Sequence, residues 1–181
     1  MEKTTKRRFG DRKDGVLLRD LDGMHFITPI IYPNRCDNEA YLSETIDLTN
    51  MNAYLEKKNA EHPDFPYTMF HVIVAALIKT ITLRPKMNRF IANKNFYQRN
   101  GVSASFVVKK QFADEAAEAL AVVRGKDEST LDTIHEDLRH QIMDCKDMTK
   151  TDTSTDFMDI FNRMPRFLGK FIVWLLKRLD I

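Results

Sequence analysis

The segment YTMFHVIVAALIKTITL, residues 67–83, constrains the fold of this chain more than any other stretch. If it is helical, apolar side chains surround the helix on nearly all sides, and such a helix is buried in a protein core or in a bilayer. Only about 12 residues precede the first charge at Lys79, whereas a bilayer span needs ~20. We therefore predict a central buried helix that Thr68 caps and Pro85 ends.

The composition is that of one globular domain. The chain has 181 residues, of which 43% are hydrophobic and 30% charged, so it can bury a sizeable core. The formal net charge is +2, but residues 1–113 hold 18 basic and 12 acidic groups, residues 114–159 hold 5 and 13, and residues 160–181 hold 5 and 1. An acidic middle between two basic ends favours charge complementarity within the chain at least as much as nucleic-acid binding.

The N-terminal residues and the cysteines bear on localisation. KTTKRRFGDRKDG, residues 3–15, is basic and has no apolar stretch, which argues against a secretory signal. Its single aromatic residue, Phe9, gives no interleaved stacking surface for bases, so we predict a basic N-terminal arm over residues 1–19 and no nucleic-acid partner. Cys36 and Cys145 are far apart and in no metal-binding spacing. We expect both to be thiols in a reducing cytoplasm.

Local patterns predict the remaining elements. Pro29 breaks the apolar segment LDGMHFITPIIY, so residues 21–32 are expected to form an irregular or short helical piece. EALAVVRG, residues 118–125, is ambiguous between helix and strand, and its late valines and Gly125 favour a strand. The other expected elements are a strand at 44–49, a helix from Thr49 or Asn50, a hairpin at 89–100 around Asn93-Lys94-Asn95, a strand at 102–110, a helix opening at Ser129–Asp132, a short helix after Thr155 or Asp156, and a last helix from Pro165.

No local pattern by itself predicts a catalytic or metal site. None of the six glycines lies in a phosphate-binding pattern, and the sequence has no His-x-x-x-His or Cys-x-x-Cys spacing. His71, on the apolar helix, is expected to be a hydrogen-bonded core residue. His140 and Asp144 are one helical turn apart, which favours a surface ion pair. Ser103 and Ser105 alternate with apolar residues in a strand and have no evident partner base.

The segment DFPYTMFHVIVAALIKTITLRPKMNRFIANKNFYQRNGVSASFVV, residues 64–108, resembles the chloramphenicol-acetyltransferase-like superfamily. It is similar in particular to the acyltransferase (catalytic) domain of 2-oxoacid dehydrogenase complexes. In that family a strand similar to ETIDLT leads to a helix, a proline- and aromatic-rich turn, a long buried helix, a hairpin, a central strand similar to VSASFVV and a helix similar to TLDTIHEDLRHQI. The same order runs over residues 20–146, and a helix similar to PRFLGKFIVWLLKRLD extends it almost to the last residue.

The resemblance implies an α/β fold for residues 20–181, an α+β two-layer sandwich in which helices cover a mixed sheet. It also implies acyl transfer from a coenzyme A thioester to a hydroxyl or thiol of a small acceptor, with no tightly bound cofactor. In the family a histidine in a His-x-x-x-Asp-Gly motif is the general base, and a Ser or Thr hydroxyl stabilises the oxyanion. The site is shared between subunits, so a homo-oligomer, a trimer by resemblance, is expected.

The sequence departs from the family at the catalytic motif. His140-x-x-x-Asp144 is followed by Cys145 rather than glycine and lies upstream of the family's motif, so no catalytic residue is carried over. The chain is expected to be the N-terminal portion of such a domain, incomplete at its C-terminus and inactive alone. Tyr32 and Phe106 match substrate-pocket positions of the family, with core packing as the simpler account of both. The alternative function is a non-catalytic binding or oligomerisation module derived from that fold.

The last predicted helix leaves a choice between protein and membrane. Its uncharged run, FIVWLL, is too short to span a bilayer. On a helical wheel Arg166, Lys170 and Lys177 fall within about 40°, and apolar side chains fill a broad opposite arc. Cations beside tryptophan also suit a helix that lies in a membrane interface. The resemblance favours a helix packed on the domain, so membrane contact is not expected but stays open as an alternative.

Overall fold

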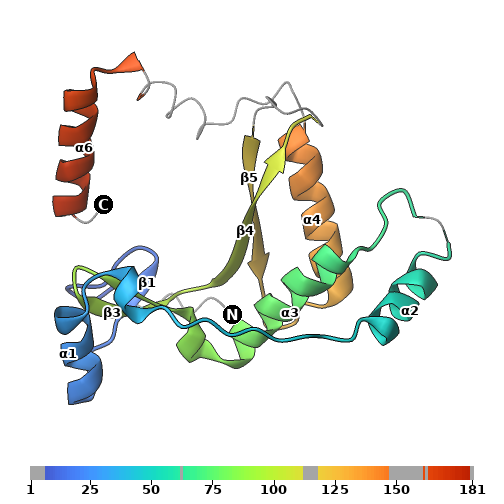
Figure 1. Ribbon diagram of the computed structural model, residues 1–181, viewed down its shortest axis with the longest axis horizontal. Coiled ribbons are helices and arrows are strands. Elements are labelled where there is room, and N and C mark those ends of the chain that lie inside the picture. The colour runs from blue at the N-terminus through green and yellow to red at the C-terminus, as the bar shows by residue number, and fades with distance from the viewer. Residues whose placement is uncertain (1–6, 62, 112–117, 147–160, 162, 180–181) are drawn as a thin grey trace. The chain divides into compact units, whose positions relative to one another are not determined.

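The computed structural model describes residues 7–61, 63–111, 118–146, 161 and 163–179. The chain divides into two compact units. Unit 1 consists of Met1–Val102 with Gly125–Leu131, and unit 2 consists of Ser103–Arg124 with Asp132–Ile181. The described residues form helices and two small sheets that are joined by loops (Figure 1). This confirms the mixed α and β class that the sequence predicts.

A three-stranded antiparallel sheet organises unit 1. It contains β1 (Gly15–Leu17), β2 (Arg89–Ala92) and β3 (Asn95–Arg99) in the order β1-β3-β2. Asn93 and Lys94 have φ angles of 44° and 63°, so both occupy the left-handed region that a tight two-residue hairpin loop requires. The predicted hairpin is confirmed, although Asn95 is already in β3, opposite Ala92.

Tyr97 is the buried centre of this sheet. It faces Leu17 of β1 on one side and Phe90 of β2 on the other. The Phe90 and Tyr97 rings stack with centroids 5.3 Å apart, and the guanidinium of Arg99 lies 4.5 Å from the Phe90 centroid. A Cβ on Gly15 would lie 2.8 Å from Phe90 Cε1, so β1 can approach the stacked pair only because residue 15 has no side chain.

Residues 7–19 of the predicted basic arm fold around the Asp11 carboxylate. It accepts hydrogen bonds from the backbone N–H groups of Arg8 (2.8 Å) and Leu17 (3.1 Å) and from the Arg19 guanidinium (3.1 Å). Gly10 turns the chain with a φ of 88°. The Asp11 side chain is only 6% exposed, and its three donors hold the strand β1 in place at the end of this loop.

Three α-helices belong to unit 1: α1 (Gly23–Ile31), α2 (Thr49–Lys58) and α3 (Met69–Leu83). Short 3₁₀ helices follow α1 and α3, at Arg35–Asn38 and Pro85–Asn88. Residues 23–31 are helical and include Pro29, and Asp22 caps the helix by accepting the His25 N–H. The predicted helix after Thr68, which ends before Pro85, is confirmed by α3.

The prediction that α3 is buried on all sides is wrong. One stripe, His71, Val74 and Ile78, is buried, whereas a second stripe of Phe70, Ile73 and Leu77 is between 42% and 53% exposed. Both stripes follow the i, i+3, i+7 spacing of a helix face. Only part of the apolar surface of α3 is therefore buried.

The predicted strand at 44–49 is also wrong. Residues 41–48 form neither helix nor strand, and Ile46 is 71% exposed. Asp47 instead accepts hydrogen bonds from the backbone N–H (2.9 Å) and the hydroxyl (2.6 Å) of Thr49 and so initiates α2. Alternation of polar and apolar residues predicts a strand only where a second strand supplies the ladder, and a local capping interaction competes with it.

Unit 2 contains a two-stranded sheet and a helix, except for their end residues Val102, Gly125 and Leu131, which belong to unit 1. Strands β4 (Val102–Lys109) and β5 (Glu118–Gly125) pair with each other (Figure 1), and α4 spans Leu131–Lys146. The predictions of both strands and of this helix are confirmed. Ala121, Val123, Ile134 and Leu138 are at most 1% exposed and form the core of the unit. The Gln141 side chain accepts a hydrogen bond from Val122 N–H at 3.4 Å, which fixes the helix against β5.

The last described helix, α6 (Arg166–Leu179), begins directly after Pro165, as the sequence predicts. The Pro165 carbonyl accepts the N–H groups of Leu168 (3.0 Å) and Gly169 (3.2 Å). The short helix expected after Thr155 falls mostly outside the described residues. Within the part of the chain that the structure describes, no helix is long and apolar enough to cross a membrane.

Candidate functional site

The two predicted pocket residues, Tyr32 and Phe106, lie in different units. Tyr32 ends α1, is 52% exposed, and its carbonyl accepts a hydrogen bond from Asn38 Nδ2 at 3.0 Å. Phe106 is half-buried in the middle of β4. Because each belongs to its own unit, their shared pocket stays a prediction.

His71 is the most buried histidine of the described residues, with 3% of its surface exposed. It occupies the third position of α3, where its Nδ1 lies 3.0 Å from the Thr68 N–H and 2.8 Å from the Thr68 hydroxyl. The Thr68 hydroxyl in turn accepts the backbone N–H of His71. This reciprocal arrangement is a capping box in which histidine takes the place of the usual Glu or Gln.

The hydrogen-bond roles at Thr68 and His71 follow from the donors. A backbone N–H can only donate, so Nδ1 of His71 accepts and carries no proton in the neutral ring. The Thr68 hydroxyl accepts the His71 N–H and can donate its own proton to the same Nδ1. A hydroxyl donating to an imidazole nitrogen is also the arrangement of a nucleophile and its general base, but here both groups satisfy the first turn of α3.

Aromatic rings surround His71 and fix its orientation. The Phe65 ring meets it edge-on at 5.4 Å and 87°, and the Tyr67 and Phe70 centroids lie 6.3 Å away. Asn59, just beyond α2, holds this segment by exchanging two hydrogen bonds with the Tyr67 backbone, at 2.8 and 2.9 Å. The end of α2 and the start of α3 are thereby joined into one rigid corner.

An open hollow of about 550 Å³ lies on α2 next to this corner. It is lined by Asn52, Leu55, Glu56, Asn59 and Ala60. Its polar groups are one carboxylate and two amides, which can hydrogen-bond a ligand but do not include a base with a nucleophile. The hollow can therefore offer hydrogen bonds to a polar ligand.

Two other histidines pair with carboxylates on exposed helix surfaces. His25 Nδ1 lies 2.7 Å from Asp22, and the two hydrogen bonds from His25 hold the pKa of the Asp22 carboxyl below its ordinary value. His140, for which the sequence predicts a surface ion pair with Asp144, lies 3.3 Å from Glu136. His140 is 72% exposed, so this is the solvent-facing ion pair of a helix surface rather than a site.

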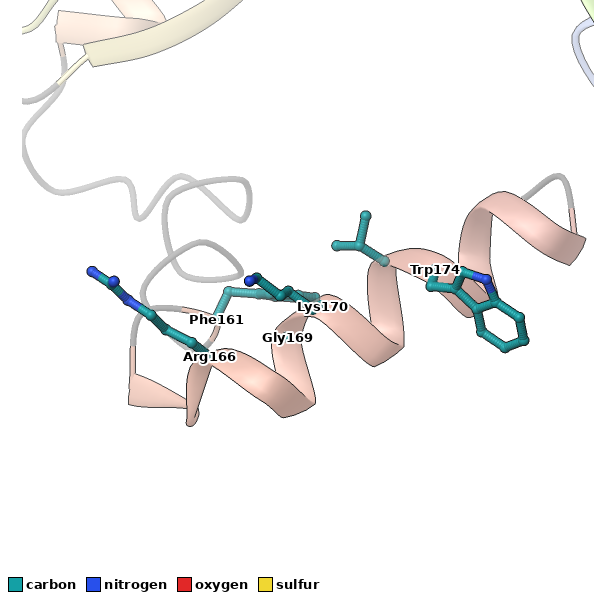
Figure 2. A pocket seen from close by; sticks show the side chains of 6 residues that line it. Phe161, Arg166, Gly169, Lys170 and Trp174 are labelled. Carbon is teal, nitrogen blue, oxygen red and sulfur yellow. The ribbon is translucent and has the colours of Figure 1, made fainter.

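A second hollow, of about 480 Å³, lies along α6 (Figure 2). Two basic residues, two aromatic residues, a valine and a glycine line it: Arg166, Lys170, Phe161, Trp174, Val173 and Gly169. Gly169 opens the hollow because it presents no side chain beside the Phe161 ring, 3.9 Å from where its Cβ would lie. The lining surface is almost wholly apolar, with two cations at its edge, which suits an apolar ligand that carries a negative charge at one end.

Sequence reasoning missed the role of Asp11. The prediction that His71 is a hydrogen-bonded core residue is confirmed, but its place in a capping box was missed. The signal for Asp11 was Gly-Asp-Arg, a turn pattern inside a stretch that its charge alone presented as a solvated arm. The signal for His71 was its place three residues after the predicted cap Thr68. The cations of α6 were identified from the helical wheel, but not the hollow that they line.

Among the described residues, no three His, Cys, Asp or Glu side chains gather as metal ligands would. Comparison of the chain with protein-family models, with curated proteins and with solved structures finds no match in any of the three.

Proposed function

We propose that this chain is an acyltransferase-type scaffold of the chloramphenicol-acetyltransferase-like kind, which takes part in acyl transfer from a coenzyme A thioester without supplying the general base. The observation that supports it is the order of α3, the β2–β3 hairpin, β4 and α4. This is the order that the resemblance implies for residues 64–146. In this proposal, the two small sheets and the extended segment before α2 are variations within the scaffold.

The contacts of the histidines support the non-catalytic part of the proposal. His71 Nδ1 is engaged by two groups of Thr68, and His25 and His140 pair with carboxylates at exposed surfaces. None of the five histidines is in a His-x-x-x-Asp-Gly motif. We therefore expect the chain to bind an acyl thioester or its acceptor more readily than it turns either over.

A thiol-release assay with acetyl coenzyme A and the purified chain tests this proposal. The expected result is thiol release no faster than in buffer, together with measurable binding of coenzyme A by calorimetry. Turnover that His71→Gln abolishes would show that the Thr68–His71 pair is a working base and would overturn the inactive assignment. Absence of both turnover and binding would remove the acyltransferase scaffold altogether.

A second candidate function, a binding or oligomerisation module, is favoured by the exposed stripe of α3. Phe70, Ile73 and Leu77 present a continuous apolar face on a rigid helix. Sedimentation of the full chain tests it: a trimer is expected, and Ile73→Asp should shift it toward monomer while Lys79→Asp, on the same helix, should not. A monomer at all concentrations would count against this function.

A further inference from the structure

We infer that α6 lies in the interface of an anionic phospholipid bilayer, with its aromatic stripe inserted and its cations on the lipid phosphates. This inference concerns a membrane partner and is independent of the acyltransferase proposal. It takes up the alternative that the sequence leaves open, and it rests on the exposure, the charge and the groove of the helix.

The aromatic side chains of α6 form one exposed stripe. Phe167, Phe171 and Trp174 follow the i, i+4, i+7 spacing of a single helix face and are 75%, 56% and 58% exposed. The Phe171 and Trp174 rings stack with centroids 5.9 Å apart. Large exposed aromatic groups that already stack on each other form a wedge, and tryptophan is enriched where bilayer and water meet.

The charges of α6 all have one sign. Arg166, Lys170, Lys177 and Arg178 are its four ionisable residues, and no acidic residue falls between Ile160 and Leu179. Arg166 and Lys170 are one turn apart and lie about 40 to 100° from the aromatic stripe on the helical wheel. A basic row beside an aromatic stripe matches a surface that is anionic outside and apolar beneath, which is the chemistry of an anionic leaflet.

The groove of Figure 2 lies where these two properties meet. Arg166 and Lys170 line it largely with their aliphatic stems, and Trp174 lines it farther along the helix. A lipid phosphate can accept hydrogen bonds from both cations while the adjoining acyl chain contacts the rings. The groove thus gives the helix an apolar place for part of one lipid beside two cations, in addition to its general attraction to negative charge.

Arg178 favours a bilayer over a protein surface as the partner. It lies four residues after Trp174 and therefore on the aromatic stripe itself, and it is exposed. A protein core that covered the stripe would also desolvate this guanidinium, whereas in a bilayer a long cationic side chain reaches back to the headgroups. With 14 residues, α6 is about 21 Å long, too short to span a bilayer but suited to lying in its plane.

Binding of the full chain to vesicles tests the inference. Trp174 is the only tryptophan, so its emission reports on this helix alone. We expect the chain to sediment with phosphatidylcholine vesicles that contain phosphatidylserine and not with pure phosphatidylcholine. Its emission should shift to the blue, brominated lipids should quench it, and high salt should release the protein.

Two pairs of substitutions distinguish vesicle binding by α6 from a general attraction between basic residues and an anionic surface. Arg166→Gln with Lys170→Gln should weaken vesicle binding about 30-fold, since each cation near an anionic surface contributes about a factor of five. Lys79→Gln with Lys86→Gln removes the same charge from exposed sites outside α6 and should leave binding unchanged. Circular dichroism of each variant checks that it is folded.

Three results would overturn the inference. They are an absence of binding to anionic vesicles, equal weakening by the two pairs of substitutions, and binding that leaves Trp174 unquenched. An oligomer in solution that shields Trp174 from a soluble quencher, without vesicle binding, would assign the stripe to a protein contact instead. Coenzyme A binding in the thiol-release experiment is unaffected by any of these results, so the two proposals fail separately.

Discussion

At the scale of single residues, Gly125 shows how closely one backbone position can be fitted. A Cβ there would clash with Cγ2 of Ile78, which is 2% exposed and cannot move aside easily. Gly125→Ala is expected to lower the free energy of unfolding by about 1–3 kcal/mol through overpacking. Gly23→Ala is the control, because nothing lies within 4 Å of the added carbon. Urea denaturation of both variants measures the difference, and equal stabilities would contradict the close contact.

Asp11 gives the chain an acid-sensitive residue. The backbone N–H of Arg8 is the largest of the causes that hold the pKa of its carboxyl below the ordinary 3.8, with Leu17 N–H and Arg19 adding to it. A carboxyl with a lowered pKa in the folded state stabilises the fold above pH 3.8 and loses this contribution as the pH falls through its folded pKa. Asp11→Asn should therefore be less stable than the wild-type chain near neutral pH, with the difference vanishing once the pH is well below the lowered pKa of Asp11.

Thermal unfolding of wild type and Asp11→Asn across this pH range measures the effect. Asp14→Asn is a matched control, since Asp14 is exposed and its carboxylate forms ion pairs with the side chains of Arg12 and Arg99. If the wild-type chain remains equally more stable than Asp11→Asn at acid pH, the contribution of Asp11 to stability does not depend on its charge.

At the scale of elements, the capping box predicts how strongly α3 depends on its first turn. Thr68→Ala removes the hydroxyl that accepts the His71 N–H and should cost about 1 kcal/mol, whereas Thr68→Ser keeps it and should cost less. Thr80→Ala, at an exposed position of the same helix, should be neutral or slightly stabilising. Urea denaturation compares the three variants, and similar values for Thr68→Ala and Thr80→Ala would contradict the cap.

Elements that carry their own signals were predictable from sequence. Asn93-Lys94 specifies its hairpin by turn chemistry, and α4 is specified by a cap followed by apolar residues at helical spacing. The expected strand at 44–49 failed because a strand also needs a distant partner, which local alternation does not supply. The burial of α3 was overestimated for the same reason, since composition shows that a face can be buried and not what covers it.

The candidate sites were less predictable than the elements. The pocket of Tyr32 and Phe106 came from the resemblance and not from any local signal, and it stays a prediction. Asp11 and His71 act through backbone N–H groups, which every residue has, so their partners depend on the path of the chain. The groove on α6 depends on the lack of a side chain at Gly169. This glycine opens a groove only because Phe161 lies beside it, which the sequence does not show.

At the scale of the whole molecule, each unit has buried residues of its own. Leu55, Val74, Ile78 and Tyr97 are buried in unit 1, and Ala119, Ala121, Val123, Ile134 and Leu138 in unit 2. Cores of this size are small for stable folding, so each depends heavily on its largest members. Leu138 is 0% exposed and one of the largest side chains in the core of unit 2.

Leu138→Ala is therefore expected to lower the stability of unit 2 by about 2–5 kcal/mol, a large share of what a domain has. Amide hydrogen exchange followed by mass spectrometry locates the effect. Exchange should become faster in β5 and α4, while β3 and α3 keep their protection, because Tyr97 and Val74 retain their own contacts. Val74→Ala should give the reverse pattern. If either variant accelerates exchange equally in both units, the two cores unfold as one cooperative structure and the division holds for geometry but not for stability.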